Sequence, residues 1–525
     1  MEKDTKVTAR VPALELKNIT KRFGTKVVAN KDISLTVYAG EILAILGENG
    51  SGKTTLMNMV SGIYYPDEGQ IFIGGKEVVI TSPSDAFKNR IGMIHQHFKL
   101  VDVFTATENI ILGLQNQGRY DLKKASQKVR EISERYGFEI DPDKKIYEMS
   151  VSEKQTVEII KVLYRGADIL MLDEPTAVLT PQESEKLFDV LRRMRADGKA
   201  IIIVTHKLHE VLEISDRVSV LRKGRYIGTV DTKDATEASL TEMMVGQKVD
   251  LNINRSEPHN PTERLIVAHL NVMSREGLKV LDDVSFTAYS GEILGIAGIA
   301  GSGQRELLET IAGLQPIQYG GIQYIDPGTG LIENLRDKTP MEIRNLGVRL
   351  SFVPEDRLGM GLVASMDIVD NMMLRSYRKG RTAFLEKKDP ENLAARIIND
   401  LEVVTPSAKT PVRRLSGGNV QKVLVGREIA AAPTVLMAAY PVRGLDINSS
   451  YMIYNLLNEQ KEKGVAVIFV GEDLDVLIGL CDRILVIGQG QITGTVDGRT
   501  AKKEEIGLLM TKGGQRKEAE GGQEQ

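Results

Sequence analysis

A glycine-rich segment, residues 47–54, has residue types and spacing that point directly to chemistry. It reads Gly-Glu-Asn-Gly-Ser-Gly-Lys-Thr and fits the pattern G-x-x-x-x-G-K-[ST] of a phosphate-binding loop. Its glycines let backbone N–H groups close around phosphate oxygens, and the helix predicted to follow adds a favourable dipole. We predict that Lys53 meets the β- and γ-phosphates and that Thr54 binds Mg²⁺. The residues expected to bind nucleotide here are Gly47, Glu48, Asn49, Gly50, Ser51, Gly52, Lys53, Thr54 and Thr55.

Two adjacent carboxylates, Asp173 and Glu174, follow the apolar run Ile-Leu-Met-Leu of residues 169–172. The first suits Mg²⁺, held through water, and the second can orient or deprotonate an attacking water molecule. An acidic pair at the end of a strand is usually structural. Because this pair accompanies a phosphate-binding loop, we predict that Asp173 is a metal ligand and that Glu174 is catalytic.

Three scattered residues fit the same site. Phe23 lies 24 residues before the loop and could stack on adenine, although a lone aromatic is more often part of a core. Gln96 could bind both Mg²⁺ and the γ-phosphate, or be an ordinary surface glutamine. His206 follows the apolar run 201–204 and could contact the γ-phosphate. We expect it to act in catalysis together with Lys53.

A second glycine-rich motif, Ser416-Gly417-Gly418-Asn419, opens an apolar helical pattern. Its serine and its unhindered backbone N–H groups would again face phosphate. The plainer interpretation is a helix N-cap, with Ser416 preceding a pair of glycines.

The sequence repeats itself. Residues 40–54 return as residues 291–305, with Gln304 and Arg305 in place of the lysine and threonine. The interval between matching residues is 251 at these loops, 259 near the middle of each copy and 266 over the C-terminal part. The interval changes in two steps and is constant between them. This pattern is typical of a duplicated domain with two loop insertions.

The duplication predicts the domain organisation. We expect a first domain over residues 11–250, a linker over 251–262, a second domain over 263–512 and a disordered tail over 513–525. Continuous apolar strands alternate with helical patterns in each copy, which favours an α/β fold on a parallel sheet. Amphipathic stretches at 121–137 and 389–401 indicate a helical subdomain in each.

Composition excludes several classes of protein. With 42% hydrophobic and 26% charged residues, the 525-residue chain is typical of a soluble globular protein, and its net charge of −3 gives no global reason to expect nucleic-acid binding. Cys481 is the single cysteine, which excludes an internal disulfide framework and a cysteine-based zinc site. Neither a secretory signal nor an apolar run of membrane-spanning length occurs, so we expect a cytosolic protein that reaches a membrane only through other proteins.

Together these residues resemble the motifs of the ATP-binding-cassette ATPases over residues 11 to 510. The phosphate loop, Gln96, the glycine-rich helix start, the acidic pair and His206 occur in that family's order and spacing. The resemblance implies two tandem P-loop cassettes, each with a mostly parallel sheet core, an antiparallel β part and a helical subdomain. It also implies ATP and Mg²⁺.

In that family two cassettes stack head to tail, and each ATP lies between one cassette's phosphate loop and the other's signature motif. The first copy has the intact loop and acidic pair but a poor signature, Ser150-Val-Ser-Glu153. The second has an intact signature motif, residues 416–419, and is eroded at Gln304, Arg305, Glu355, Ala439, Tyr440 and Glu472. The resemblance therefore implies intramolecular pairing of the cassettes and one hydrolytic site per chain.

Tandem cassettes divided in this way look like the ATPase subunits of bacterial simple-sugar and nucleoside importers. Segments 92–101, 107–110 and 353–357 resemble the nucleoside branch, which favours a purine nucleoside over a ribose- or galactose-type sugar. The resemblance implies two membrane permease subunits and a substrate-binding lipoprotein as partners, contacted through residues 82–113 and 355–372. It also implies no nucleic acid, no direct membrane insertion and a peripheral place at the cytoplasmic face of the cell membrane.

Two other classes compete with this interpretation. A soluble twin-cassette protein acting on ribosomes or DNA usually keeps both sites intact and carries a long charged linker or zinc insertions. A regulatory nucleotide binder without catalysis is disfavoured by Lys53 and Glu174. We therefore expect ATP hydrolysis coupled to solute transport.

Overall fold

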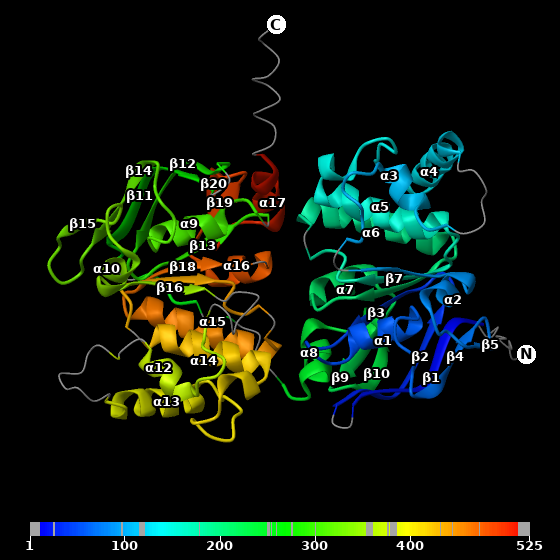
Figure 1. Cartoon of the computed structure of the whole chain (residues 1–525), viewed down its shortest axis with the longest axis horizontal. Coiled ribbons are helices and arrows are strands. Elements are labelled where there is room, and N and C mark those ends of the chain that lie inside the picture. The colour runs from blue at the N-terminus through cyan, green and yellow to red at the C-terminus, as the bar shows by residue number, and fades with distance from the viewer. Residues whose placement is uncertain are drawn as a thin grey trace, which may run out of the picture. The chain divides into compact units, whose positions relative to one another are not determined.

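A computed structural model shows two compact units in the chain, residues 1–250 and 251–525 (Figure 1). The structure describes residues 11–24, 27–95, 98–114, 121–177, 179–248, 253, 255–258, 260–274, 277–299, 301–352, 361–374, 377, 386–430, 432–443, 445–471 and 473–512. The segments expected as linker and tail lie partly or wholly outside these ranges.

A ten-stranded sheet organises the first unit, in the order β5-β4-β1-β2-β10-β9-β3-β8-β7-β6. Its parallel strands are β3 (Ile42–Leu46), β6 (Ile91–Ile94), β7 (Ile169–Asp173), β8 (Ala200–Val204) and β9 (Arg217–Arg222). The strand β10 (Arg225–Asp231) pairs antiparallel with β9. Its antiparallel part consists of β1 (Pro12–Phe23), β2 (Val27–Tyr38), β4 (Glu68–Ile73) and β5 (Lys76–Val78). One parallel bridge, between Arg225 and Lys31, joins the two parts.

The central strands are apolar along their whole length because helices cover both faces of a parallel sheet. Every residue of β3, β7 and β8 is buried, and the strands predicted at residues 41–46, 169–172 and 201–204 are confirmed. The helices packed on this core are α1 (Lys53–Val60), α2 (Pro83–Lys88), α6 (Pro181–Ala196), α7 (Leu208–Ile214) and α8 (Glu237–Val245).

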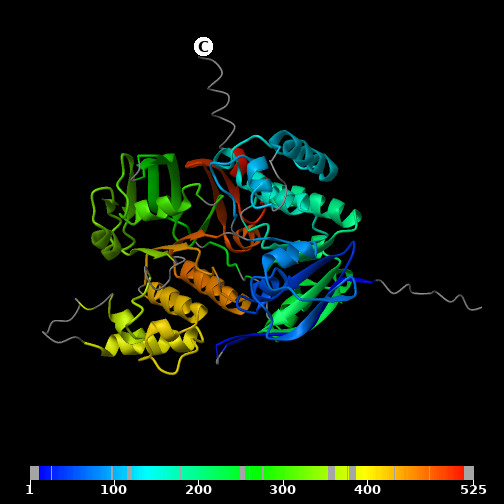
Figure 2. The ribbon, with the colours of Figure 1, turned by 45° about the vertical axis from the view of Figure 1, so that its right-hand side comes forward.

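A helical subdomain completes the first unit, and its helices stand apart from the strands β1, β2 and β4 (Figure 2). It contains α3 (Ala106–Ile111), α4 (Leu122–Tyr136) and α5 (Val151–Tyr164), which share a small apolar core that includes Ile110, Val129 and Val157. The predicted helix at 121–137 is confirmed, with Asp121 as its N-cap and Gly137, at φ 76°, as its C-cap.

The second unit repeats this plan with two separate sheets. One is the six-stranded sheet β16 (Val348–Phe352), β17 (Val435–Ala439), β18 (Ala466–Val470), β13 (Ile293–Ala297), β19 (Arg483–Gly488) and β20 (Gln491–Asp497). The other is the antiparallel sheet β12 (Lys279–Tyr289), β11 (Glu263–Met273), β14 (Tyr319–Ile325) and β15 (Ile332–Asn334). The described helices are α9 (Gln304–Ile311), α10 (Pro340–Asn345), α12 (Ile368–Met373), α13 (Lys388–Asp400), α14 (Gly417–Ile429), α15 (Ile447–Glu462), α16 (Leu474–Leu480) and α17 (Lys503–Thr511).

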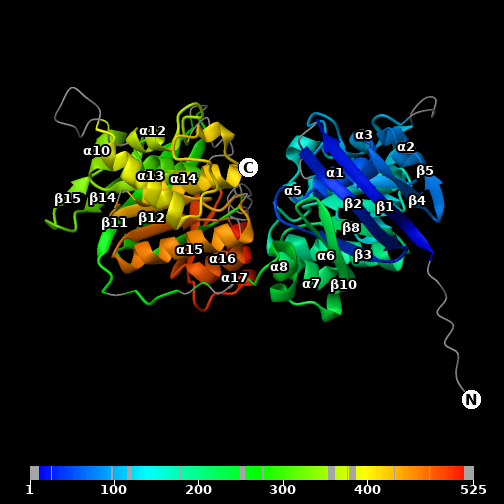
Figure 3. The ribbon, with the colours of Figure 1, turned by 90° about the horizontal axis from the view of Figure 1, so that it is seen from below.

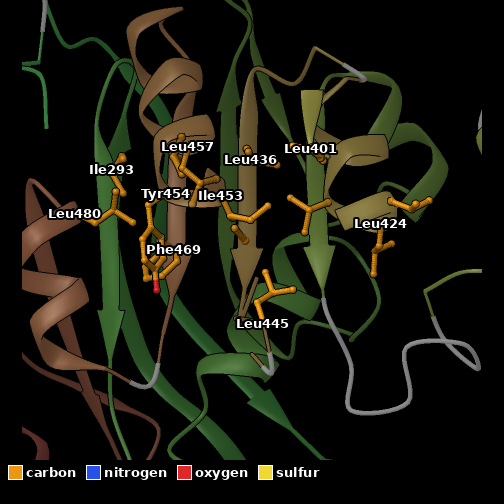
Figure 4. Packing of buried hydrophobic residues seen from close by; sticks show 14 of the residues in the cluster. Ile293, Leu401, Leu424, Leu436, Leu445, Ile453, Tyr454, Leu457, Phe469 and Leu480 are labelled. Carbon is orange, nitrogen blue, oxygen red and sulfur yellow. The ribbon is translucent and has the colours of Figure 1, made fainter. Parts of the chain in front are cut away.

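Two apolar cores lie on the two faces of this six-stranded sheet. One is built with α14, α15 and α16, and within it Tyr454 and Phe469 pack edge to face with ring centroids 6.2 Å apart (Figure 4). The other contains α9 and the inner residues of β11 and β12. Both units are therefore α/β, each with a parallel core, an antiparallel part and a helical region.

None of the helices in the described ranges is long and apolar enough to cross a membrane.

Candidate nucleotide-binding site

The predicted phosphate loop, residues 47–52, joins β3 to α1, whose first residue is Lys53. Gly50 and Gly52 have φ values of 79° and 96°, in the left-handed region that glycine adopts without strain. A Cβ on Gly52 would lie 2.5 Å from the carbonyl oxygen of Ala29, so the loop presses directly on β2. Figure 3 shows β2 running beside α1. The first N–H groups of α1 have no partner within the helix, which makes this turn a ready site for an anion.

Two buried polar atoms at the loop have no hydrogen-bond partner among the described residues. They are the hydroxyl oxygen of Ser51 and the side-chain oxygen of Asn30, whose Nδ2 donates to the carbonyl of Gly52 at 3.2 Å. Buried polar groups in proteins nearly always have partners. A hydroxyl left without one inside a glycine-rich loop fits a phosphate group as its missing partner.

Lys53 is folded into the loop and is only 7% exposed. Its Nζ donates to the carbonyl oxygens of Gly47 at 2.6 Å and Glu48 at 3.0 Å. Burial lowers the pKa of this ammonium, and the negative charges of Glu174 and Asp173 oppose that shift. The lysine and the acidic pair therefore belong to one electrostatic group, as the sequence predicts.

Asp173 ends β7 and is 9% exposed. Burial raises the pKa of its carboxyl and the neighbouring Glu174 adds to this, while Lys53 and a side-chain hydrogen bond with Thr54 lower it. The Thr54 hydroxyl and the Asp173 carboxylate are thus adjacent oxygen groups, the kind of ligand that Mg²⁺ prefers. The described residues contain no cluster of three or more acidic, histidine or cysteine side chains that could hold a metal alone. An ion that is bound mainly by nucleotide phosphates needs only one or two protein oxygens, so these residues fit Mg²⁺.

Glu174 and His206 form a direct pair. Nδ1 of His206 donates to Oε1 of Glu174 at 3.0 Å, with the imidazole 56% exposed and the carboxylate 19% exposed. This hydrogen bond lowers the pKa of Glu174 more than burial raises it. The arrangement keeps a carboxylate ionised beside solvent, with a donor that fixes its orientation.

The backbone at Glu174 takes an unusual conformation, with φ 47° and its N–H donating to the carbonyl of Val204 at 2.8 Å. Tyr440 occupies the matching place in the second unit, with φ 50° and its N–H donating to Val470 at 2.9 Å. The left-handed turn is thus a property of both units, whether or not a carboxylate follows the strand.

Phe23 is the last residue of β1 and is 40% exposed, so it is not the core aromatic of the plainer interpretation. Its ring meets that of Tyr64 edge to face, with centroids 5.3 Å apart. Sequence reasoning missed Tyr64, because no spacing rule connects the segment after α1 with the end of β1. Together the two rings form an exposed aromatic surface suited to a flat base.

The remaining predicted site residues are placed as follows. Asn49 is exposed and Thr55 is partly buried on the first turn of α1. Gln96 lies outside the described residues, as do Glu355 and Glu472 of the second copy.

The second unit keeps the loop but not its charges. Gly303 has φ 106°, matching Gly52, and α9 begins directly after it. Gln304 is 3% exposed and its Nε2 donates to the carbonyl of Ile299 at 3.2 Å, so it takes the place of the lysine within the loop. Arg305, in the place of the threonine, pairs with Glu309 at 2.7 Å.

The two signature motifs differ in the charge at the helix start. Ser416 is the N-cap of α14, as the plainer interpretation predicts, and Nδ2 of Asn419 donates to its hydroxyl at 2.8 Å. In the first unit Ser150 caps α5 in a capping box with Glu153, whose carboxylate accepts from the Ser150 N–H at 2.7 Å and pairs with Lys144 at 2.8 Å. A carboxylate already occupies that helix start, which disfavours phosphate there.

Comparison with known proteins agrees with this geometry. The family model "ABC transporter" matches residues 30–177 and 281–441, together more than half of the chain. Among curated relatives, a guanosine import ATP-binding protein, NupO of Bacillus subtilis (strain 168), is 43% identical over 511 residues, covering 96% of this chain and 98% of the relative. A nucleoside import ATP-binding protein, NupA of Lactococcus lactis subsp. cremoris (strain MG1363), is 40% identical, covering 96% and 99%. A ribose import ATP-binding protein, RbsA 2 of Escherichia coli O157:H7, is 36% identical, covering 95% and 97%.

The chain therefore belongs to the ABC transporter family. The family model matches once in each of the two α/β units, so each unit is one cassette of the family. Within the family it is a two-cassette ATPase of the sugar and nucleoside importer group.

Proposed function

We propose that this chain hydrolyses ATP to drive the import of nucleosides, with a purine nucleoside as the favoured solute. The observation that carries the proposal is the order of identities: the guanosine and nucleoside importers at 43% and 40% stand above the ribose importer at 36%. Because the difference is small, a ribose- or galactose-type sugar is the second candidate. The partners would be two permease subunits and a substrate-binding lipoprotein, with the ATPase at the cytoplasmic face of the membrane.

The chemistry is assigned to the first unit. Lys53 would bind the β- and γ-phosphates, while Ser51 and the N-terminus of α1 donate to their oxygens. Glu174, ionised and oriented by His206, would direct water at the γ-phosphate. Phe23 would stack on adenine. Phosphoryl transfer depends mainly on such positioning and on charge stabilisation.

Mg²⁺ would be held by Thr54 and Asp173, and Gln96 is the third proposed ligand. When bound, the ion neutralises charge on the phosphate oxygens. The matching residues of the second unit, Gln304, Arg305 and Ala439 among them, offer neither the ammonium nor the metal ligands. We propose one hydrolytic site per chain on this ground.

The signature motif of the second unit, residues 416–419, is the proposed second half of that site. Its support is the contrast in charge: the α14 start carries an amide where the α5 start carries a carboxylate. A substitution can test this without disturbing the fold. A Cβ on Gly418 would lie 3.5 Å from Leu445, an ordinary contact, and an acidic residue in the first turn favours the helix.

Gly418→Asp is therefore expected to keep the stability of the second unit while lowering ATP hydrolysis by about 10²-fold or more. Gly418→Ala is the matched control, with the same Cβ and no charge. Normal hydrolysis by Gly418→Asp would refute a composite site.

The solute is tested in the complete transporter. The chain is reconstituted in liposomes with its permeases and binding lipoprotein, and ATP hydrolysis is measured with guanosine, ribose or galactose added. If only guanosine stimulates ATP hydrolysis, the proposal is supported. If only a sugar stimulates it, the solute is the second candidate, a sugar, and not a nucleoside. Glu174→Gln is expected to lower turnover by about 10²- to 10⁴-fold while ATP still binds. The same assay with this variant therefore measures the ATP hydrolysis that does not come from the proposed site.

A further inference from the structure

Residues that follow Glu174 and His206 closely in the chain form a largely buried polar cluster. The hydroxyl of Thr176 donates to Oε2 of Glu210 at 2.6 Å, and Nζ of Lys207 pairs with Oε1 of the same carboxylate at 3.0 Å. The Lys207 ammonium also donates to the carbonyl oxygen of Thr176 at 3.1 Å. Thr176 is 1% exposed and Glu210 is 5% exposed, whereas the Lys207 side chain is 23% exposed, so the hydroxyl and the carboxylate have exchanged water for these partners.

The cluster joins the two segments that carry the catalytic pair. Thr176 is two residues beyond Glu174, in the turn after β7, and Lys207 directly follows His206 after β8. Glu210 lies in the first turn of α7 and reaches back to both. Because the pair itself spans only 3.0 Å, a small movement of either segment would break it.

The second unit provides a natural comparison. At the matching positions it has Val442 and Val476, which pack against the apolar core, and Asp473, which caps α16. The strand end before them is Ala439-Tyr440, with no carboxylate to position. The same turn and helix thus form without the polar cluster, so the fold does not require it. A buried carboxylate is costly unless it is fully paired, and the pairing can fix a unique local geometry.

We propose that Glu210, together with Thr176 and Lys207, is a positioning group that holds Glu174 and His206 in register for hydrolysis. This rests on the proposed role of Glu174. The cluster acts through the backbone of the two turns that carry Glu174 and His206.

The test is the double variant Thr176→Val/Glu210→Val in the full chain, which installs the side chains of the second unit. We expect kcat for ATP to fall about 10- to 100-fold, as for a small displacement of a catalytic group, while KM changes less than about twofold. Glu210→Gln, which keeps an acceptor for Thr176 but not the charge, should give a smaller loss and carries the test if the double variant does not fold.

A matched control variant distinguishes a positioning role of the cluster from a role in stability alone. Tyr136→Phe removes another short, partly buried hydrogen bond of the first unit, from the hydroxyl of Tyr136 on α4 to Asp197 at 2.6 Å. It should lower Tm and leave kcat and KM unchanged. The proposal is overturned if the double variant keeps kcat within twofold, or if Tyr136→Phe reproduces its kinetic change. If Glu174→Gln instead hydrolyses ATP at the normal rate, the proposed role of Glu174 is wrong, and this proposal is wrong with it.

Discussion

Replacing Lys53 by glutamine imitates a change that the second unit already contains. In the first unit Nζ of Lys53 reaches two loop carbonyls, at 2.6 and 3.0 Å. In the second unit Gln304 occupies the same place and donates to one carbonyl at 3.2 Å, within a loop of the same glycine conformation. Lys53→Gln should therefore fit the loop, so that the variant tests the charge and not the shape.

The expected magnitude follows from what the charge contributes. A hydrogen bond from a charged group contributes about 1.5–3 kcal/mol, which corresponds to roughly a 10- to 150-fold loss of ATP affinity. A contact that strengthens in the transition state adds about 10²- to 10³-fold in kcat. Stability should stay the same or rise slightly, because the desolvation of the buried ammonium, which outweighs its attraction to Asp173 and Glu174, is relieved.

The assay has three parts on the full chain: ADP release, equilibrium binding of a fluorescent ATP analogue, and Tm. Gln304→Lys is the reciprocal variant. It buries an ammonium beside Ala439 and Tyr440, where the first unit has two carboxylates, so it should lower Tm without raising hydrolysis. Hydrolysis by Lys53→Gln within threefold of the wild type would refute the reasoning. A gain of activity in Gln304→Lys would refute the assignment of a single hydrolytic site.

Two further predictions concern the same site. Gly52→Ala places a Cβ 2.5 Å from a backbone carbonyl at φ 96°, and it should cost about 1–3 kcal/mol of stability and at least 10-fold in ATP affinity. Gly303→Ala, at φ 106°, should cost similar stability but leave hydrolysis within about twofold of the wild type. Tm and ADP release measure these effects, and equal losses of hydrolysis in the two variants would contradict the prediction. His206→Ala removes the hydrogen bond that lowers the pKa of Glu174, so the carboxyl is protonated at higher pH and the acid limb of the kcat–pH profile moves upward, together with a fall in kcat. An unmoved acid limb would show that Glu174 does not set it.

Sequence patterns were sufficient where function depends on short stretches of chain. The loop of residues 47–54 and the acidic pair 173–174 each lie at or just beyond the end of one strand. Their chemistry can therefore be predicted from residue type and spacing along one short segment. The duplication and the loss of charges at Gln304 and Ala439 are also visible in the sequence alone. Gln96 remains a prediction, since it lies outside the described residues.

The tertiary structure decided which distant segments meet. Asp173 pairs with Val204 in the parallel register of β7 and β8, and this register brings Glu174 next to His206. No local spacing fixes that alignment, because parallel strands are joined by a long crossover whose length does not set their register. The buried link from Thr176 to Glu210 depends on the same alignment, so it could be recognised only once the two strands were in place.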